Sequence, residues 1–298
     1  MGGGPGAQTW GPDDPRAPGG DRASKVLGPL HTEGARGVLI ATVSTLVVLT
    51  AVAIVVVRSP NWLLFKQSFF DAKVLGDSFP DIARAFLRNI EWFLIAEPII
   101  LALALLIAVM RSLPGPVFFP LRVMAIVYVD VLRGIPTILV IYLLGFGIPA
   151  LQIPGLPNAA VFWGMVGLVL SYSAYVAEVY RAGIESVHPC QTAAARSLGL
   201  SRVQTLRHVV VPQAVRRVVP PLMNDFIALQ KDTALISIVA GTLPEAFLQG
   251  QIYQSATFNF TPILGVAICF LVITLPQTRV VDWLVARQRS RREGGLTL

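Results

Sequence analysis

Residues 38–57 form a run without a single charged side chain, and this run limits the folds open to the chain. A predominantly apolar run of about 20 residues is long enough to cross the hydrocarbon layer of a membrane as one helix. Because that layer holds no water to bond the backbone, an unpaired segment must satisfy its own N–H and C=O groups as a helix. We therefore expect residues 36–58 to form a transmembrane helix.

Five further apolar segments follow the first one, at about residues 92–110, 123–149, 159–177, 218–240 and 262–285. Charged residues make up 14% of the chain and hydrophobic residues 54%. Soluble domains average about 25% charged residues, so a large soluble core is excluded. The sequence predicts an all-α fold, a polytopic membrane bundle of about six transmembrane helices.

The basic residues orient the six expected spans. Residues 181–217 contain six arginines and one acid, Glu185, and residues 287–298 add four more arginines. Both regions fall on the side of the N-terminus, and the positive-inside rule makes that side cytoplasmic. The segment 58–90 carries both signs of charge and is weak contrary evidence. The net charge of +7 is thus explained by membrane topology, and we expect no nucleic-acid partner.

The two ends of the chain differ from the apolar centre. Residues 1–35 are rich in glycine and proline and cannot bury enough apolar surface to order themselves, so we expect a disordered cytoplasmic tail. Residues 287–298 are expected to form a basic cytoplasmic tail. The two cysteines imply no disulfide framework, and the spacing of histidines and cysteines fits no metal site.

A polar segment interrupts the apolar pattern between residues 191 and 212. Residues 191–198 favour a helix in water, and Gly199 ends it because glycine accepts the left-handed conformation. Ser201 and Gln204 have the spacing of a capping box, which starts a second helix. Pro212 is expected to break the hydrogen bonding of that helix. The prediction is two short helices at a bend, a shape that also suits an amphipathic connector resting on lipid headgroups.

Three stretches favour a partner-docking loop over such a connector. The segment from Ala193 to Gly199, closed by Pro212, resembles the EAA loop of ABC importer permeases. Residues 128–137, 173–184 and 212–235 resemble the neighbouring segments of the permeases for polar amino acids of the histidine, glutamine and glutamate type. The resemblance covers about residues 85–285, with all segments in the expected order. The family's usual unit has five spans, so the span at 36–58 is additional to it.

The resemblance implies a permease domain at residues 85–286 with a coupling loop at 183–217 that docks on a separate ATPase. The coupling residues implied by the motif are Ala193, Ala194, Ala195, Arg196, Gly199 and Pro212. Ala193 occupies the position where the family usually has glutamate, so the polar contact of that glutamate is absent. We expect docking to depend on Arg196, on the bend at Gly199 and on apolar burial.

The resemblance also implies a division of labour among several chains. The chain contains no G-x-x-x-x-G-K-[ST] phosphate loop, so ATP and Mg²⁺ are expected in a partner ATPase, and this chain is expected to be neither an enzyme nor a cofactor carrier. The implied partners are an extracytoplasmic solute-binding protein, a second permease subunit, identical or paralogous, and the lipid bilayer. The implied location is a bacterial plasma membrane, and the implied cargo is a polar amino acid such as glutamate or glutamine.

Ionisable groups inside a bilayer are costly and usually face a pathway or a partner. On this ground four residues are candidates for the translocation path: Glu97, Glu178, Lys231 and Asp232. Lys231 and Asp232 lie about midway along the fifth expected span. They line the path or form a structural ion pair, although adjacent residues on a helix do not face each other.

Glu97 and Glu178 each have a structural alternative. Glu178 stands three residues before Arg181, the spacing of an ion pair along a helix. Glu97 precedes Pro98, a kinking residue, and marks either a substrate cavity or a hydrogen bond to the bundle. A different class of protein also fits buried charge in kinked spans: an ion-coupled secondary transporter that uses Glu97, Lys231 and Asp232 as a relay.

Overall fold

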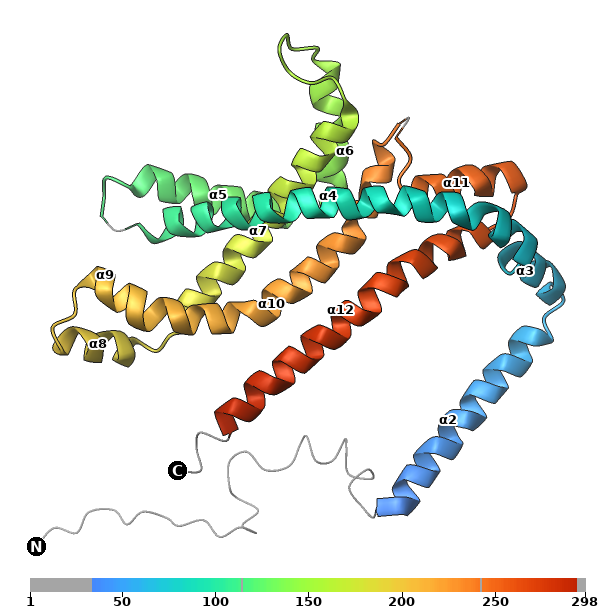
Figure 1. The fold of residues 1–298 in the computed structure, drawn as a ribbon, viewed down its shortest axis with the longest axis horizontal. Helices are drawn as coiled ribbons and strands as arrows, with labels where there is room; N and C mark the ends of the chain where they lie inside the picture. The colour runs from blue at the N-terminus through green and yellow to red at the C-terminus, as the bar shows by residue number, and fades with distance from the viewer. Residues whose placement is uncertain (1–33, 114, 242, 294–298) are drawn as a thin grey trace, which may run out of the picture. The chain divides into compact units, whose positions relative to one another are not determined.

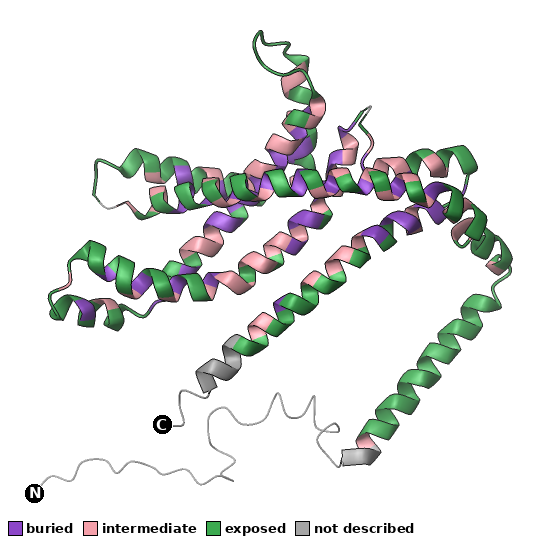
Figure 2. Cartoon of the chain, in the orientation of Figure 1, coloured by how far each residue is buried: buried purple, intermediate pink, exposed green. Residues whose placement is uncertain are grey.

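The computed structural model describes residues 34–113, 115–241 and 243–293, and the regular elements in these ranges are all helices (Figure 1). The chain divides into two units, residues 1–64 and 65–298. In the first unit, α2 (Gly34–Val57) is the expected first span, and its side chains from Val38 onward are exposed (Figure 2). An apolar helix exposed along its length is suited to lipid contact. The expected tail at 1–35 lies almost entirely outside the described residues.

The second unit is built around one central helix, α7. Its longer helices are α4 (Ala72–Ser112), α5 (Phe119–Gly134), α6 (Thr137–Ala150), α7 (Ala160–Glu185), α10 (Val211–Asp232), α11 (Ala246–Thr257) and α12 (Thr261–Glu293). α7 packs against α4, α5, α6 and α10. The core at these contacts contains the fully buried side chains of Ile100, Val129, Ile141, Leu168 and Leu229. The short helix α3 (Trp62–Phe69) precedes α4.

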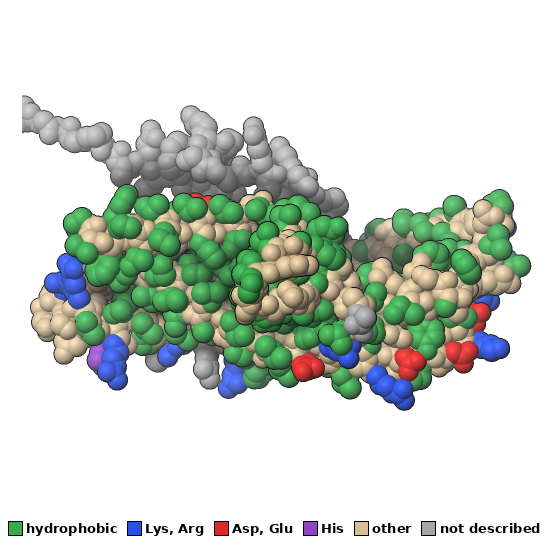
Figure 3. Space-filling model, turned by 90° about the horizontal axis from the view of Figure 1, so that it is seen from above, with side chains coloured by type: hydrophobic (Ala, Val, Ile, Leu, Met, Phe, Trp, Pro, Cys, Tyr) green, Lys and Arg blue, Asp and Glu red, His purple; other side chains and the backbone are tan. Residues whose placement is uncertain are grey.

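Four helices in the described part of the chain are long and apolar enough to cross a membrane, and the bent pair α5–α6 would make a fifth. The all-α membrane class is therefore confirmed. Hydrophobic side chains cover most of the face seen in Figure 3, and charged side chains gather along one edge. A surface of this kind is expected where lipid tails replace water.

Two of the six expected spans differ from the prediction. The segment 123–149 is broken into α5 and α6, which meet at 104°. Pro136 disfavours helical backbone at Ile135, which is extended with φ −103° and ψ 131°. The segment 218–240 does not form one apolar helix, because α10 ends at Asp232 and a 3-10 helix, η2 (Thr233–Ile238), follows.

α4 is longer than the expected span at 92–110. Asp71 caps its first turn by accepting hydrogen bonds from the backbone N–H groups of Lys73 and Val74. The helix then continues through Pro80 and Pro98 to Ser112. The half of α4 before Trp92 packs on α11 and α12. α4 thereby connects the central core to these two C-terminal helices.

A buried hydrogen-bond network attaches α11 to α4. The side-chain amide of Asn89 donates to Glu245 Oε2 at 2.8 Å and to Thr233 Oγ1 at 3.1 Å, and its oxygen accepts from the N–H of Ala246 at 3.0 Å. Glu245 is fully buried and also caps α11 by accepting from Phe247 and Leu248. Burial raises the pKa of the Glu245 carboxyl, and the bonds it accepts oppose that rise.

Candidate functional site

The bend predicted at Gly199 is present. α8 (Pro189–Ser197) ends there, and Gly199 has φ +87°. The N–H of Gly199 donates to the carbonyl of Arg196 at 3.0 Å, and the N–H of Leu200 donates to the carbonyl of Ala195 at 3.2 Å. These two bonds form a Schellman motif, which satisfies carbonyls that the helix end leaves unpaired. The backbone of Gly199 therefore sets the direction in which the chain leaves α8.

The predicted capping box is also present. The Ser201 hydroxyl accepts from the N–H of Gln204 at 3.3 Å, and the Gln204 side chain accepts from the N–H of Ser201 at 2.9 Å. These bonds start α9 (Arg202–Thr205) three residues after Gly199. Figure 1 shows α8 and α9 at one end of the second unit, beyond the ends of α7 and α10. We call α8, Gly199 and α9 together the α8–α9 tip.

The prediction that Pro212 breaks the second helix is wrong. The helical backbone continues from α9 through a π-helical turn, η1 (Leu206–Val210), into α10. The N–H of Val211 bonds to the carbonyl of Leu206, five residues back. Pro212 follows in the first turn of α10, where its missing N–H is tolerated. The wider π turn accommodates the proline ring without ending the helix.

The α8–α9 tip exposes small, basic and apolar side chains. Ala193, Ala194 and Arg196 are exposed, whereas Ala195 is buried. Leu198 is 85% exposed and Val203 73% exposed, high values for apolar residues. The motif did not single out Leu198, although an isolated leucine next to a helix-ending glycine was a visible signal. The tip therefore presents unburied apolar surface at a bend of fixed backbone.

Close packing connects the two helices that lead into and out of the tip. A Cβ atom at Gly183 of α7 would lie 2.0 Å from Val218 Cγ1 of α10, so this approach requires glycine. Nearby, Arg217 of α10 donates to the carbonyl of Ser186, which follows α7. The ends of α7 and α10 are thereby held together where the tip begins.

Glu178 lies at the centre of a charge cluster that joins three helices. Its Oε2 accepts from Arg111 Nη1 of α4 at 2.8 Å and lies 3.9 Å from Arg133 Nη1 of α5. On α7 itself, Arg181 Nε contacts Glu178 at 3.1 Å, which confirms the pair expected from their spacing, and Arg181 also bonds to Glu185 at 2.5 Å. The side chains of Glu178 and Arg111 are only 22% and 15% exposed. Sequence reasoning did not pair Arg111 or Arg133 with Glu178, because both arginines are distant from it along the chain.

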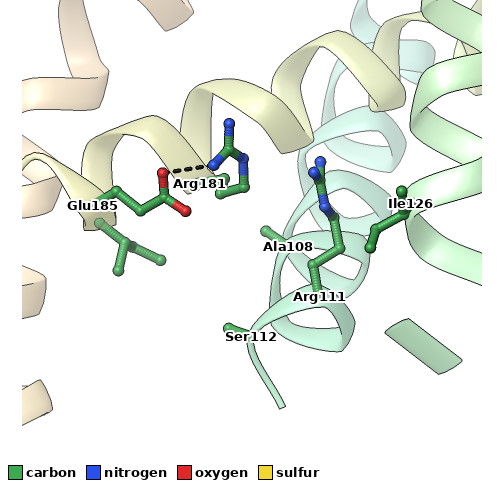
Figure 4. Close-up of a pocket in the computed structure, with 7 residues that line it drawn as sticks. Ala108, Arg111, Ser112, Ile126, Arg181 and Glu185 are labelled. Atoms are coloured by element: carbon green, nitrogen blue, oxygen red, sulfur yellow. Dashed lines mark hydrogen bonds and ion pairs between the residues drawn. The ribbon is translucent and has the colours of Figure 1, made fainter. Parts of the chain in front are cut away.

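A cavity of about 280 Å³ adjoins this cluster. Figure 4 shows Arg111 with Ala108 and Ser112 on α4, Arg181 with Glu185 on α7, and Ile126 on α5. The cavity lies beside the last turns of α4 and α7 and the middle of α5. Its walls combine apolar side chains with two guanidinium groups that the carboxylates of α7 partly neutralise.

A second group of polar side chains lies among α4, α7 and α10. The Tyr172 hydroxyl of α7 donates to Asp232 Oδ2 at 2.8 Å. Glu97 is half-buried on α4, and its carboxyl lies close enough to Asp225 of α10 for electrostatic repulsion. Sequence reasoning missed Asp225, although an acid within residues 222–229 was as visible as Asp232. The structure thus brings three carboxylates from two helices into one region of the bundle.

Lys231 and Asp232 do not occupy the middle of a span as predicted. They are the last two residues of α10, where the α-helix changes to the 3-10 helix η2. Lys231 is exposed, whereas Asp232 is half-buried and bonded to Tyr172. The two side chains point in different directions, as expected for neighbours on a helix. In the described ranges no three histidine, cysteine or acidic side chains are grouped as metal ligands.

The sequence of this chain is similar to those of known proteins. Residues 116–290 match the family described as binding-protein-dependent transport system inner membrane component. The chain is 34% identical to the probable glutamine ABC transporter permease protein GlnM of Bacillus subtilis, over 73% of this chain and 97% of that one. It is 32% identical to the glutamine transport system permease protein GlnP of Escherichia coli, over 56% and 74% of the two chains.

A solved structure is similar as well. The crystal structure of an amino acid ABC transporter with histidines superimposes with a TM-score of 0.65 and 30% sequence identity. The match covers 73% of this chain and 98% of that chain. The shared region therefore includes nearly the whole of that solved chain.

Proposed function

The chain belongs to the binding-protein-dependent transport system inner membrane components, among the polar amino-acid ABC permeases, and on that premise we propose its place in an importer. It forms half of the path by which a polar amino acid of the glutamate or glutamine type crosses a bacterial plasma membrane. It is not an enzyme and holds no cofactor, since this family is the transport component of the importer. ATP and Mg²⁺ bind to a partner ATPase, and an extracytoplasmic solute-binding protein delivers the cargo.

The α8–α9 tip is the observation that carries this proposal. An exposed apolar side chain at a rigid bend, next to an exposed arginine, fits insertion into a groove of a partner protein. The proposed coupling residues are Ala193, Ala194, Ala195, Arg196, Gly199 and Pro212. Of these, Ala195 acts by packing, and Pro212 acts where the helix continues into α10. Leu198 joins this set because of its exposure. The basic charge of residues 181–217 supports a cytoplasmic tip, and hence cytoplasmic termini.

The proposed mechanism follows from how the tip is attached. When the ATPase subunits close, they displace the tip, and the contact of Gly183 with Val218 passes this movement to α7 and α10. Glu97 of α4 and Asp232 of α10 belong to the polar group that lies among α4, α7 and α10, so both are proposed to line the path, together with Lys231 at the end of α10. Glu178 is proposed to act from the path's edge, where it holds α4 and α5 to α7.

Reconstitution tests this function directly. The chain is co-purified with its candidate ATPase, second permease subunit and solute-binding protein, placed in proteoliposomes, and assayed with labelled glutamine and glutamate. We expect uptake that requires internal ATP and the solute-binding protein together. Uptake by this chain alone, driven by an ion gradient without ATP, would instead establish the secondary transporter that its buried charges also allow.

The substitution Leu198→Asp is expected to weaken binding of the ATPase about tenfold or more. The reason is that burying a leucine side chain contributes about 1.5–3 kcal/mol, and each 1.4 kcal/mol corresponds to a factor of ten. Retention of the ATPase on immobilised permease, titrated by concentration, measures the effect. Leu151→Asp is the matched control, because Leu151 is 64% exposed but lies after α6, away from the tip. Equal losses in both variants would contradict a docking role for Leu198.

A further inference from the structure

The charges around the cavity beside Glu178 do not cancel. Three guanidinium groups meet two carboxylates there, and the contacts between them link Arg111, Arg133, Arg181, Glu178 and Glu185. One positive charge is left over. A cavity with a surplus positive charge attracts an anion, most strongly where neighbouring protein excludes water.

Arg111 has hydrogen-bond donors to spare at this cavity. Its side chain is only 15% exposed, and among the described residues it donates through Nη1 alone, to Glu178. Nε and Nη2 of the same guanidinium are therefore available to a ligand. Arg181 differs, because its three nitrogens all bond to Glu178 or Glu185. A guanidinium fork with free donors matches two oxygens of a phosphate group.

The remaining wall of the cavity is mostly apolar. Ala108 of α4, Ile126 of α5 and Ile184 of α7 line it beside Arg111 and Arg181 (Figure 4). Ile126 is 41% exposed and Ile184 38% exposed. A cavity needs about 10–15 Å³ to hold one water, so the volume of about 280 Å³ has room for a much larger group. The cavity thus offers a basic part and an apolar part to one ligand.

The position of the cavity along the helices indicates where that ligand comes from. α4 ends at Ser112 and α7 ends at Glu185, shortly before α8 begins the α8–α9 tip. The cavity therefore lies at the same end of α7 as the tip, which is the cytoplasmic end in the proposed function. Anionic phospholipids give the cytoplasmic leaflet a negative surface, and basic pockets between helices on that side suit their headgroups.

We propose that this cavity binds the phosphate group of an anionic phospholipid from the cytoplasmic leaflet. Arg111 donates to the phosphate oxygens, and Ile126 and Ile184 contact the glycerol and the first acyl carbons. The side of the membrane rests on the proposed function, whereas the phosphate site rests on the cavity itself. A free phosphate ion offers the same oxygens but gains nothing from the apolar wall, so the geometry favours the lipid.

The substitution Ser112→Asp tests the site and leaves the five charged side chains unchanged. Ser112 is exposed at the end of α4 and lines the cavity. The added carboxylate should cancel the surplus charge and lower the affinity for an anionic lipid about fivefold, the factor that one charge contributes near an anionic membrane surface. Ser112→Asn is the matched control, because asparagine has the shape of aspartate without its charge. Ser197→Asp adds the same charge to α8 at an exposed residue that does not line the cavity. Both controls should keep the lipid affinity within about twofold.

Thermal unfolding of the assembled complex in neutral detergent measures the binding. The complex is titrated separately with short-chain phosphatidylglycerol, short-chain phosphatidylcholine and inorganic phosphate. A ligand that binds the folded protein alone raises the unfolding temperature as its concentration exceeds Kd. We expect such a rise with phosphatidylglycerol, and we expect it to require about fivefold more lipid in Ser112→Asp.

Three results would overturn the inference. They are equal stabilisation by the two lipids, stabilisation by inorganic phosphate without any by phosphatidylglycerol, and an equal effect of Ser112→Asp and either control. The measurement requires neither cargo nor ATP hydrolysis. A complex that binds the lipid as expected but shows no ATP-dependent uptake would contradict the proposed function alone, so the two failures are distinguishable.

Discussion

Replacing Glu178 with alanine is expected to reduce coupled uptake strongly and to lower the stability of the permease. Glu178 is the acid shared by Arg111, Arg133 and Arg181, which come from α4, α5 and α7. Its removal leaves three guanidinium groups close together at a site where the Arg111 side chain is only 15% exposed. Breaking a buried pair on one side costs about 3–5 kcal/mol, and the partial exposure here reduces the expected loss to about 2 kcal/mol.

Removal of the Glu178 side chain should lower transport more than it lowers ATP hydrolysis. α7 leads directly into the α8–α9 tip, and the Glu178 cluster holds α7 to α4 and α5. Without the cluster a displaced tip moves the end of α7 alone. We therefore expect uptake per ATP hydrolysed to fall about tenfold, which corresponds to about 1.4 kcal/mol. Parallel measurement of uptake and phosphate release in proteoliposomes gives this ratio, and thermal unfolding in detergent gives the stability.

Glu185→Ala is the matched control for Glu178→Ala. Glu185 is also on α7 and also pairs with Arg181, but its side chain is 61% exposed. Exposed pairs of this spacing contribute about 0.3–0.5 kcal/mol, so this variant should transport and unfold almost as the unchanged protein does. Glu178→Gln keeps the size of the side chain and removes only the charge. If Glu178→Ala and Glu185→Ala behave alike, the cluster does not hold the helices as we describe.

The sequence predicted best those features that depend on a few neighbouring residues. The bend at Gly199 and the capping box of Ser201 with Gln204 are local, because each is set by residues at most five apart. The break between α5 and α6 was equally local: the residue before Pro136 is disfavoured in a helix, but the long apolar run concealed this signal. Apolar runs therefore predict membrane helices more reliably than they predict where a helix bends.

Contacts between distant segments could not be predicted in this way. Arg111 and Glu178 are 67 residues apart, and Asn89 and Glu245 are 156 residues apart. The pairing of these residues depends on which helices pack together, and the sequence around each residue does not indicate its distant partner. The prediction for Pro212 was wrong for a different reason. Proline commonly breaks a helix, but the π-helical turn before Pro212 accommodates its ring. The sequence thus located the two short helices and the bend of the α8–α9 tip, while the charge cluster behind the tip required the packed helices.

Replacing Gly199 with valine is expected to uncouple ATP hydrolysis from uptake while the protein still inserts and folds. At φ +87° a β-branched residue is strongly disfavoured, at a cost of about 1–3 kcal/mol. No heavy atom lies within 4 Å of the position that a Cβ would occupy, so the effect comes from the backbone and not from a collision. The Schellman bonds to Ala195 and Arg196 should be lost, and α9 should leave α8 in another direction.

The expected result for Gly199→Val is a fall of about tenfold or more in uptake per ATP hydrolysed, from a cost of at least 1.4 kcal/mol in the docked geometry. Gly199→Asn is the control, because asparagine tolerates the left-handed conformation best after glycine. Uptake per ATP hydrolysed in Gly199→Asn should stay within about threefold of the value for the unchanged protein, since the left-handed conformation still has some free-energy cost for asparagine. Both variants place a side chain in open space at the bend, so they differ chiefly in backbone preference. Equal uncoupling by valine and asparagine would mean that the side chain itself blocks the ATPase. Normal coupling in Gly199→Val would show that coupling does not require the bend at Gly199.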